Sequence, residues 1–118
     1  MEFRDDVPPS GGNRSVFISG GCIVPHAYFT LISPASESYL SLRCRGKNLS
    51  SGGEIQLRRI SDWKKNVWIS INDTVWAPYQ SADTLFCPAL DTLSLELTSG
   101  GLKPSAMLVD LIEVLRVK

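Results

Sequence analysis

The chain has 118 residues, a formal net charge of zero, 43% hydrophobic residues and 20% charged residues. This length fits one domain with its own core, and the composition excludes an intrinsically disordered chain. The zero net charge argues against a nucleic-acid partner, because such proteins usually carry a basic excess that neutralises phosphates. No apolar run approaches the length of a membrane-spanning helix, so we expect no membrane partner.

The N-terminal residues 1–14 are expected to form a flexible arm, since Pro8, Pro9 and two glycines leave them without core-forming side chains. Residues 15–118 are expected to form the folded domain. Met1–Asn13 has no apolar segment of the kind that a signal peptide requires. The chain as given is therefore expected to be cytoplasmic, unless it is a trimmed domain whose signal has been removed.

Beyond the arm, short apolar segments alternate with turn residues. In the clearest segments every second side chain is apolar, which is the period of a strand with one buried face. The predicted strands, in chain order, are Val16–Ser19 with a continuation over Cys22–Val24, Ala27–Ile32, Tyr39–Arg45, Glu54–Arg59, Asn66–Ile71, Thr74–Ala77, Thr84–Cys87, Leu93–Thr98 and Met107–Val117.

The alternation also predicts which side chains face the core. Side chains expected to face inward are Leu40, Leu42, Cys44, Ile55, Leu57, Val67, Ile69, Ile71, Leu93, Leu95 and Leu97, while Ser41, Arg43, Arg45, Gln56 and Trp68 are expected to face outward. Gly46–Gly53 is predicted to be a turn, and Asn72–Asp73 a hairpin turn into Thr74–Ala77. The β-branched residues of Met107–Val117 favour a strand there, although a short terminal helix is left open.

About nine or ten strands at a spacing of roughly 8–12 residues, with no long helical period, are typical of a sandwich or barrel. The sequence therefore predicts an all-β protein, a single antiparallel β-sandwich with jelly-roll topology.

The order of these segments resembles the galactose-binding-like jelly-roll sandwiches, especially the non-catalytic carbohydrate-binding modules of that fold. The resemblance covers roughly residues 38–117 and is carried by Tyr39–Gly46 followed by Gly52–Leu57, by Val67–Asp73, and by Leu93–Thr98 followed by Leu108–Val114. It implies a binding domain for glycans. Members that bind sugar through calcium use acidic residues before the last strand, whereas Ser99–Ser105 contains none, so we expect no metal there.

Nothing in the sequence predicts catalysis or a cofactor. The single histidine, His26, has no nucleophile pattern near it, and the acidic pairs Asp5–Asp6 and Asp62 with Asp73 lack a spacing that would select them for glycoside hydrolysis. The three cysteines have no metal-ligand spacing, and Cys44 is expected to be a small buried hydrophobe. A disulfide between Cys22 and Cys87 is left open. We therefore expect no enzyme, no cofactor and no metal.

Aromatic residues provide the main functional signal, because flat exposed rings stack on sugar rings while neighbouring polar groups bind hydroxyls. A polysaccharide or glycan is the expected ligand class. The predicted carbohydrate-binding residues are Trp76, Tyr79 and Trp63, with Arg43, Gln56 and Asp83 as polar partners. The alternative is a protein-interaction or oligomerising domain, in which Trp68 lies at a subunit interface and the chain forms a homo-oligomer. The basic residues between Arg43 and Lys65 are expected to be a solvated face.

Overall fold

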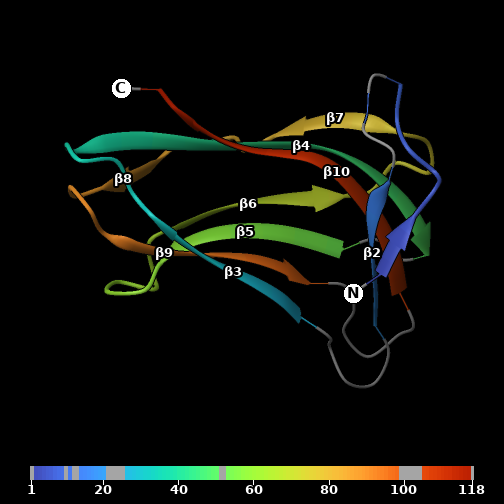
Figure 1. The fold of residues 1–118 in the computed structure, drawn as a ribbon, viewed down its shortest axis with the longest axis horizontal. Helices are drawn as coiled ribbons and strands as arrows, with labels where there is room; N and C mark the ends of the chain where they lie inside the picture. Colours follow the sequence, from blue (N-terminus) through green and yellow to red (C-terminus); the bar gives the residue numbers. More distant parts are fainter. Residues whose placement is uncertain are drawn as a thin grey trace.

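The computed structural model describes residues 2–9, 11, 14–20, 26–50, 53–98 and 105–117, and these form ten strands without a helix (Figure 1). The strands are β1 (Glu2–Arg4), β2 (Ser15–Gly20), β3 (His26–Ile32), β4 (Ser38–Ser50), β5 (Gly53–Arg59), β6 (Asn66–Ile71), β7 (Ala77–Gln80), β8 (Leu85–Cys87), β9 (Thr92–Thr98) and β10 (Ser105–Arg116).

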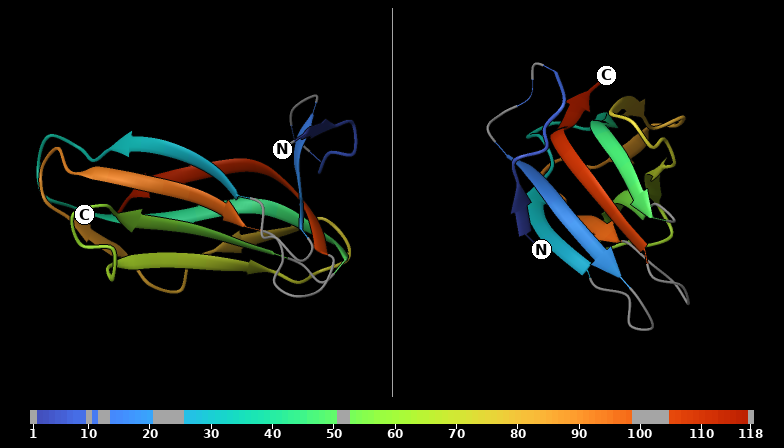
Figure 2. Two further views of the ribbon diagram at one scale, coloured as in Figure 1. Left: turned by 90° about the horizontal axis from the view of Figure 1, so that it is seen from below. Right: turned by 90° about the vertical axis from the view of Figure 1, so that its right-hand side faces the viewer.

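The strands form two antiparallel sheets. The first has the order β1-β2-β10-β4-β7, with β8 also paired to β4, and the second has the order β3-β9-β5-β6 (Figures 1 and 2). From β2 onward the pairs are nested along the chain: β2 with β10, β3 with β9, β4 with β7 and β8, and β5 with β6. A long hairpin rolled up in this way is a jelly roll. The predicted antiparallel β-sandwich is confirmed.

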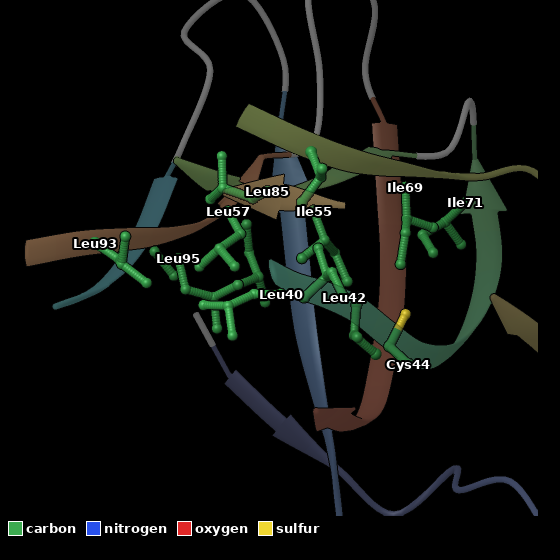
Figure 3. Packing of buried hydrophobic residues seen from close by; sticks show 14 of the residues in the cluster. Leu40, Leu42, Cys44, Ile55, Leu57, Ile69, Ile71, Leu85, Leu93 and Leu95 are labelled. Carbon is green, nitrogen blue, oxygen red and sulfur yellow. The ribbon is translucent and has the colours of Figure 1, made fainter. Parts of the chain in front are cut away.

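The core lies between the two sheets and is built from the alternate residues that the sequence assigned to it (Figure 3). Leu42 on the first sheet and Ile55, Leu57, Ile71 and Leu97 on the second are fully buried. The predicted outward orientation of Trp68 is also confirmed, because its side chain points away from the core and is 56% exposed.

The last segment is the strand β10, which excludes the terminal helix. Its pairing with β4 is regular up to Asp110 and resumes at Glu113, so the strand contains a β-bulge between these residues. Leu111, within the bulge, has a φ of 54°, in the left-handed region that a leucine rarely adopts. The bulge leaves Leu111 partly exposed while Ile112 and Val114 pack against the core.

Two turn predictions are wrong. The predicted turn Gly46–Gly53 is strand up to Ser50, because β4 continues its pairing with β10 as far as Asn48. The predicted hairpin at Asn72–Asp73 is instead a crossing between sheets: β6 pairs with β5, whereas the next strand, β7, pairs with β4. Consequently the strand expected at Thr74–Ala77 begins only at Ala77.

The described part of residues 1–14, for which a flexible arm is expected, makes contacts with the sandwich. Glu2–Arg4 forms β1, which pairs antiparallel with β2. Pro8 is buried, and Asp6 is tied to β4 through a 2.6 Å ion pair between its Oδ2 and the Nζ of Lys47. Contacts of this kind, between residues far apart in the chain, cannot be predicted from local composition.

Among the buried polar and sulfur-containing side chains, one differs from its predicted position. Ser41, expected to face outward, is buried because the connection after β7 covers it, with the hydroxyls of Ser41 and Ser81 3.5 Å apart. Cys44 is a buried thiol as predicted, and burial raises its pKa to about 12. Cys87 is also a free buried thiol, so it forms no disulfide; Cys22, like the strand expected at Cys22–Val24, lies outside the described residues.

Replacing Gly46 with alanine will destabilise the sandwich. A Cβ at this buried position in β4 would lie 2.7 Å from the Cδ1 of Ile71 on the other sheet, so the facing side chain must shift. Overpacking of this kind costs about 1–3 kcal/mol. Urea unfolding measures the loss, with Ser50→Ala at an exposed position of the same strand as the control. Equal stabilities of Gly46→Ala and wild type would contradict tight packing here.

Candidate functional site

The exposed ring of Trp68 lies on the outer face of β6, at one edge of the four-stranded sheet. Gln56 on β5 is paired directly with it. Side chains of directly paired residues lie on the same face of a sheet, so Gln56 lies beside the tryptophan. The Oε1 of Gln56 accepts a hydrogen bond from Arg58 of the same strand, which fixes the amide and leaves its NH2 group as a donor.

The connection that follows β7 brings Asp83 to the same ring. A hollow of about 120 Å³ is lined by Asn66, Val67, Trp68, Ala82 and Asp83. Within the described part of the chain, the carboxylate of Asp83 is exposed and has no hydrogen-bond or ion-pair partner. We call Gln56, Asn66, Trp68 and Asp83 together the Trp68 face. It combines one aromatic surface with amide donors and a carboxylate acceptor.

The same outer face continues across the sheet. The paired residues Tyr28, Glu96, Gln56 and Trp68 form one row over β3, β9, β5 and β6. Tyr28, at the far end of the row, is 61% exposed. Strands lie about 4.8 Å apart, so the two aromatic residues are separated by roughly 14 Å. Between them the surface is polar, and the Nε of Arg58 lies 3.2 Å from the Oε2 of Glu96 without a well-aligned hydrogen bond.

Two of the predicted stacking residues are engaged in contacts within the protein. The indole Nε1 of Trp76 donates a 2.9 Å hydrogen bond to Asp6, and the ring is partly buried. Hydrogen bonds from Lys47 and then from Trp76 lower the pKa of Asp6. The Trp76 indole therefore anchors the N-terminal segment.

Tyr79 supports the crossing between the sheets. Its hydroxyl accepts hydrogen bonds from the backbone N–H groups of Asn72 and Asp73 and donates one to the Asp73 carboxylate. Its ring packs against the core. Burial, followed by the hydrogen bond to Asp73, raises the pKa of Tyr79. These contacts hold the connection that replaces the predicted hairpin.

The remaining predicted site residues are divided over the molecule. Gln56 and Asp83 meet at Trp68, whereas Arg43 lies on the other sheet, where it pairs with Glu113. Trp63 is 64% exposed in the turn between β5 and β6. Asn66 is not among the residues predicted from the sequence, and Trp68 is predicted to lie at a subunit interface in the alternative function. The sequence signal that could have identified this face is the out-of-phase position of Trp68 in its strand.

The basic residues between Arg43 and Lys65 form no continuous patch, because several of them are paired with carboxylates. These ion pairs are Arg43–Glu113, Lys47–Asp6, Arg58–Glu96 and Arg59–Asp91. They are also divided between the two sheets, since Arg43 and Lys47 lie on β4 and Arg58 and Arg59 on β5.

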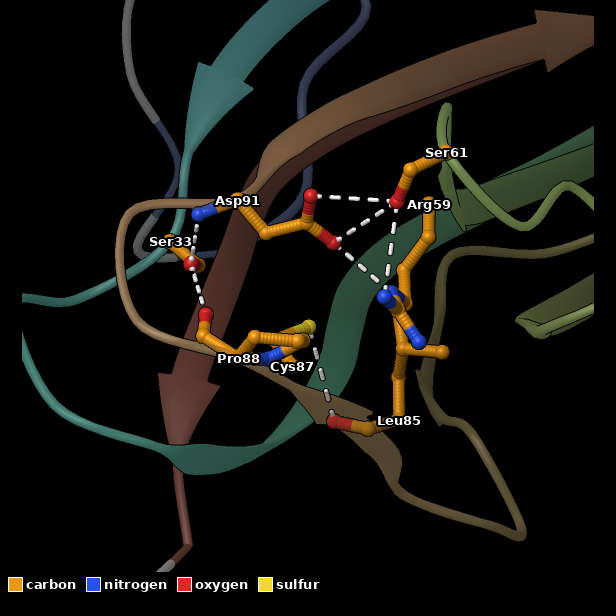
Figure 4. Close-up of polar contacts among 7 residues, drawn as sticks. All are labelled: Ser33, Arg59, Ser61, Leu85, Cys87, Pro88 and Asp91. Atoms are coloured by element: carbon orange, nitrogen blue, oxygen red, sulfur yellow. Dashed lines mark hydrogen bonds and ion pairs between the residues drawn. The ribbon is translucent and has the colours of Figure 1, made fainter.

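The Arg59–Asp91 pair belongs to a larger cluster of polar contacts (Figure 4). The Nε of Arg59 donates a 2.7 Å hydrogen bond to Asp91, and the hydroxyl of Ser61 donates to the same carboxylate. The backbone N–H of Asp91 donates to the hydroxyl of Ser33, which in turn donates to the carbonyl of Pro88. The cluster thus ties the end of β5 to the loop between β8 and β9.

The pKa of Asp91 is lowered, first by the hydrogen bond from Arg59. Because its folded-state pKa lies below the unfolded value, Asp91 stabilises the fold above pH about 4, and this contribution is lost as the pH falls further. We expect Asp91→Asn to unfold a few degrees below wild type at pH 7 and at nearly the same temperature in strong acid. Calorimetry across this pH range measures the difference, and a gap that widens on acidification would contradict the assignment.

Among the described residues, no group of three or more histidine, cysteine, aspartate or glutamate side chains lies close enough to hold a metal ion. Nor do these residues include a helix that is long and apolar enough to cross a membrane.

The fold and the Trp68 face define the class of protein: an all-β jelly-roll sandwich with an exposed aromatic surface on its four-stranded sheet. The chain matches no model of a known protein family, and a comparison with curated proteins finds no match either.

Proposed function

We propose that this protein is a non-catalytic carbohydrate-binding domain whose ligand stacks on Trp68. The observation that supports the proposal most directly is the grouping of an exposed indole ring with the Asp83 carboxylate and the amides of Asn66 and Gln56. A sugar ring presents an apolar C–H surface on its faces and hydroxyl groups around its rim. The first matches an aromatic ring and the second matches amide and carboxylate groups.

In this mechanism Trp68 supplies apolar contact area and the polar groups determine orientation. The Asp83 carboxylate accepts hydrogen bonds from hydroxyls, and a hydrogen bond with a charged acceptor is stronger than a neutral one. The Gln56 amide, already held by Arg58, donates without having to be ordered on binding. The row that leads to Tyr28 extends the surface toward a second aromatic residue, so an oligosaccharide fits better than a single sugar.

The resemblance of the sequence to galactose-binding-like sandwiches and their carbohydrate-binding modules supports the same proposal. The two antiparallel sheets of the structure are compatible with a β-sandwich of this kind. Because no calcium ligands are expected before the last strand, the proposed binding is independent of metal.

The proposal is tested by titrating the protein with soluble polysaccharides and following tryptophan fluorescence, with and without calcium. We expect a saturable change with one class of glycan, unaltered by chelation. Acrylamide quenching provides the control, because a bound glycan will protect an exposed tryptophan from the quencher. If no glycan of the panel reduces the quenching by acrylamide, the proposal is contradicted for that panel.

A second candidate function, self-association, is favoured by the edge strand β3. This strand contains neither proline nor a lysine, arginine or carboxylate, and its Tyr28, Phe29 and Ile32 are 61%, 41% and 61% exposed. An uncharged edge pairs readily with a second copy of itself. By contrast, β7 carries Pro78, a residue that protects an edge from pairing. Sedimentation analysis distinguishes a dimer from a monomer, and Phe29→Lys should dissociate the dimer.

A further inference from the structure

A cleft lies on the other sheet, away from the Trp68 face. It has a volume of about 450 Å³, within the range of roughly 300–1,000 Å³ found for small-molecule sites. Its walls come from β4, β7 and β10, and we call it the β4–β7 cleft. The side chains used below are Arg43, Arg45, Pro78, Leu111 and Glu113.

The bulge in β10 gives this cleft an apolar wall. In a regular ladder the position after Asp110 would turn inward, but the extra residue places Leu111 on the cleft side, 38% exposed and in a left-handed conformation. Pro78, exposed on the opposite side, is paired with Arg45 across the ladder. A ligand in the cleft therefore meets apolar groups from two strands. Bulges and unusual backbone conformations are frequent at binding sites.

The charges of the cleft are balanced except at Arg45. Arg43 is held by Glu113, with its Nε and NH2 groups 3.3 and 3.1 Å from the two carboxylate oxygens. Arg45 is partly buried, and in the described part of the chain its guanidinium has no hydrogen-bond or ion-pair partner.

Asp110 is the residue paired with Arg45 on β10, yet its carboxylate is engaged elsewhere. Its Oδ1 accepts a 2.8 Å hydrogen bond from the backbone N–H of Leu111, which helps to hold the bulge. Its Oδ2 lies beside Gly11, only 2.6 Å from where a Cβ on that residue would be. The carboxylate thus packs against the N-terminal segment.

We propose that the β4–β7 cleft is a second binding site, specific for a carboxylate-bearing sugar such as a uronic acid residue of a glycan. Arg45 donates to the ligand carboxylate, and the planar guanidinium fork matches a carboxylate with two parallel hydrogen bonds. Leu111 and Pro78 contact the apolar face of the sugar ring. Glu113, fixed by Arg43, accepts a hydrogen bond from a hydroxyl group. This site is distinct from the Trp68 face and does not depend on it.

The test compares galacturonic acid trisaccharide with its fully methyl-esterified form, which keeps the shape and removes the charge. Binding is followed by amide chemical shifts in the protein carrying Trp68→Ala, so that the cleft is measured separately from the Trp68 face. We expect the acid to bind and to shift residues of β4, β7 and β10. We expect esterification to weaken binding about tenfold or more, the effect of losing a hydrogen bond to a charged group.

Arg45→Gln should weaken binding of the acid by a similar factor, whereas Lys64→Gln, at an exposed position in the turn between β5 and β6, should not. Added salt should weaken it as well, since the contact is ionic. Equal affinity for acid and ester, or unchanged affinity of Arg45→Gln, would overturn the proposal. If acetate competes at the same concentration as the trisaccharide, the cleft is a general anion site and the proposed sugar contacts are refuted. Loss of cleft binding in the Trp68→Ala protein alone would refute the independence of the two sites.

Discussion

Replacing Trp68 with alanine will reduce glycan affinity at the Trp68 face by about thirtyfold or more, the loss of a binding hot spot of about 2 kcal/mol. The indole is 56% exposed on the outer face of β6 and, in the proposed function, supplies the apolar surface on which a sugar ring stacks. Stability should change by less than about 0.5 kcal/mol, because the side chain lies outside the core. Isothermal titration with the glycan selected by the panel measures the affinity, and thermal unfolding measures the stability.

Trp63→Ala is the matched control, since Trp63 is another exposed tryptophan, at 64%, that does not line the hollow beside Trp68. It should keep wild-type affinity. Asp83→Asn and Gln56→Ala should each weaken binding less than Trp68→Ala, because each removes one hydrogen-bonding group. If Trp63→Ala abolishes binding while Trp68→Ala does not, the ligand lies on the turn between β5 and β6 and the proposed face is wrong.

The second large effect concerns stability. Leu57→Ala should lower the free energy of unfolding by about 2–5 kcal/mol, the range for truncating a fully buried leucine. Leu57 lies on β5, in the interior of the four-stranded sheet, and is paired with both Val67 and Leu95. No part of its side chain is exposed, so alanine leaves a cavity between the sheets. The loss is a large fraction of a typical domain stability of about 5–15 kcal/mol.

Urea unfolding of the variant measures this effect, with Val75→Ala as the control at a side chain that is 67% exposed. The control should lie within about 0.5 kcal/mol of wild type. A loss at Leu57 no larger than the loss at Val75 would mean that the side chain does not pack between the sheets as described.

The inward and outward faces of most strands could be predicted from the sequence because alternation is a local property. Leu57, Ile69 and Trp68 each lie on the side that the pattern indicates. The pairing of strands could not be predicted in the same way, since it depends on residues far apart in the chain. The crossing after Asn72 and Asp73 is an example: locally it has the composition of a hairpin turn, yet the next strand belongs to the other sheet.

The candidate site illustrates the same limit. The position of Gln56 opposite Trp68 follows from the register of β5 and β6, which local patterns alone do not determine. Asp83 reaches Trp68 only because the connection after β7 returns to the edge of the other sheet. Conversely, the sequence predicts Trp76 and Tyr79 as ligand-binding residues, but both side chains make hydrogen bonds within the protein. The Trp76 indole donates to Asp6, and the Tyr79 hydroxyl accepts from the backbone N–H of Asp73. Asp6 and Trp76 are 70 residues apart in the sequence, so local patterns could not predict that contact.

The central claim, that a glycan stacks on Trp68, is tested most directly by following the indole N–H signals of the three tryptophans during a glycan titration by NMR. We expect the Trp68 signal to shift until binding saturates, while the Trp76 signal, whose N–H donates a hydrogen bond to Asp6, stays in place. Binding that shifts Trp76 and leaves Trp68 unchanged would contradict the claim.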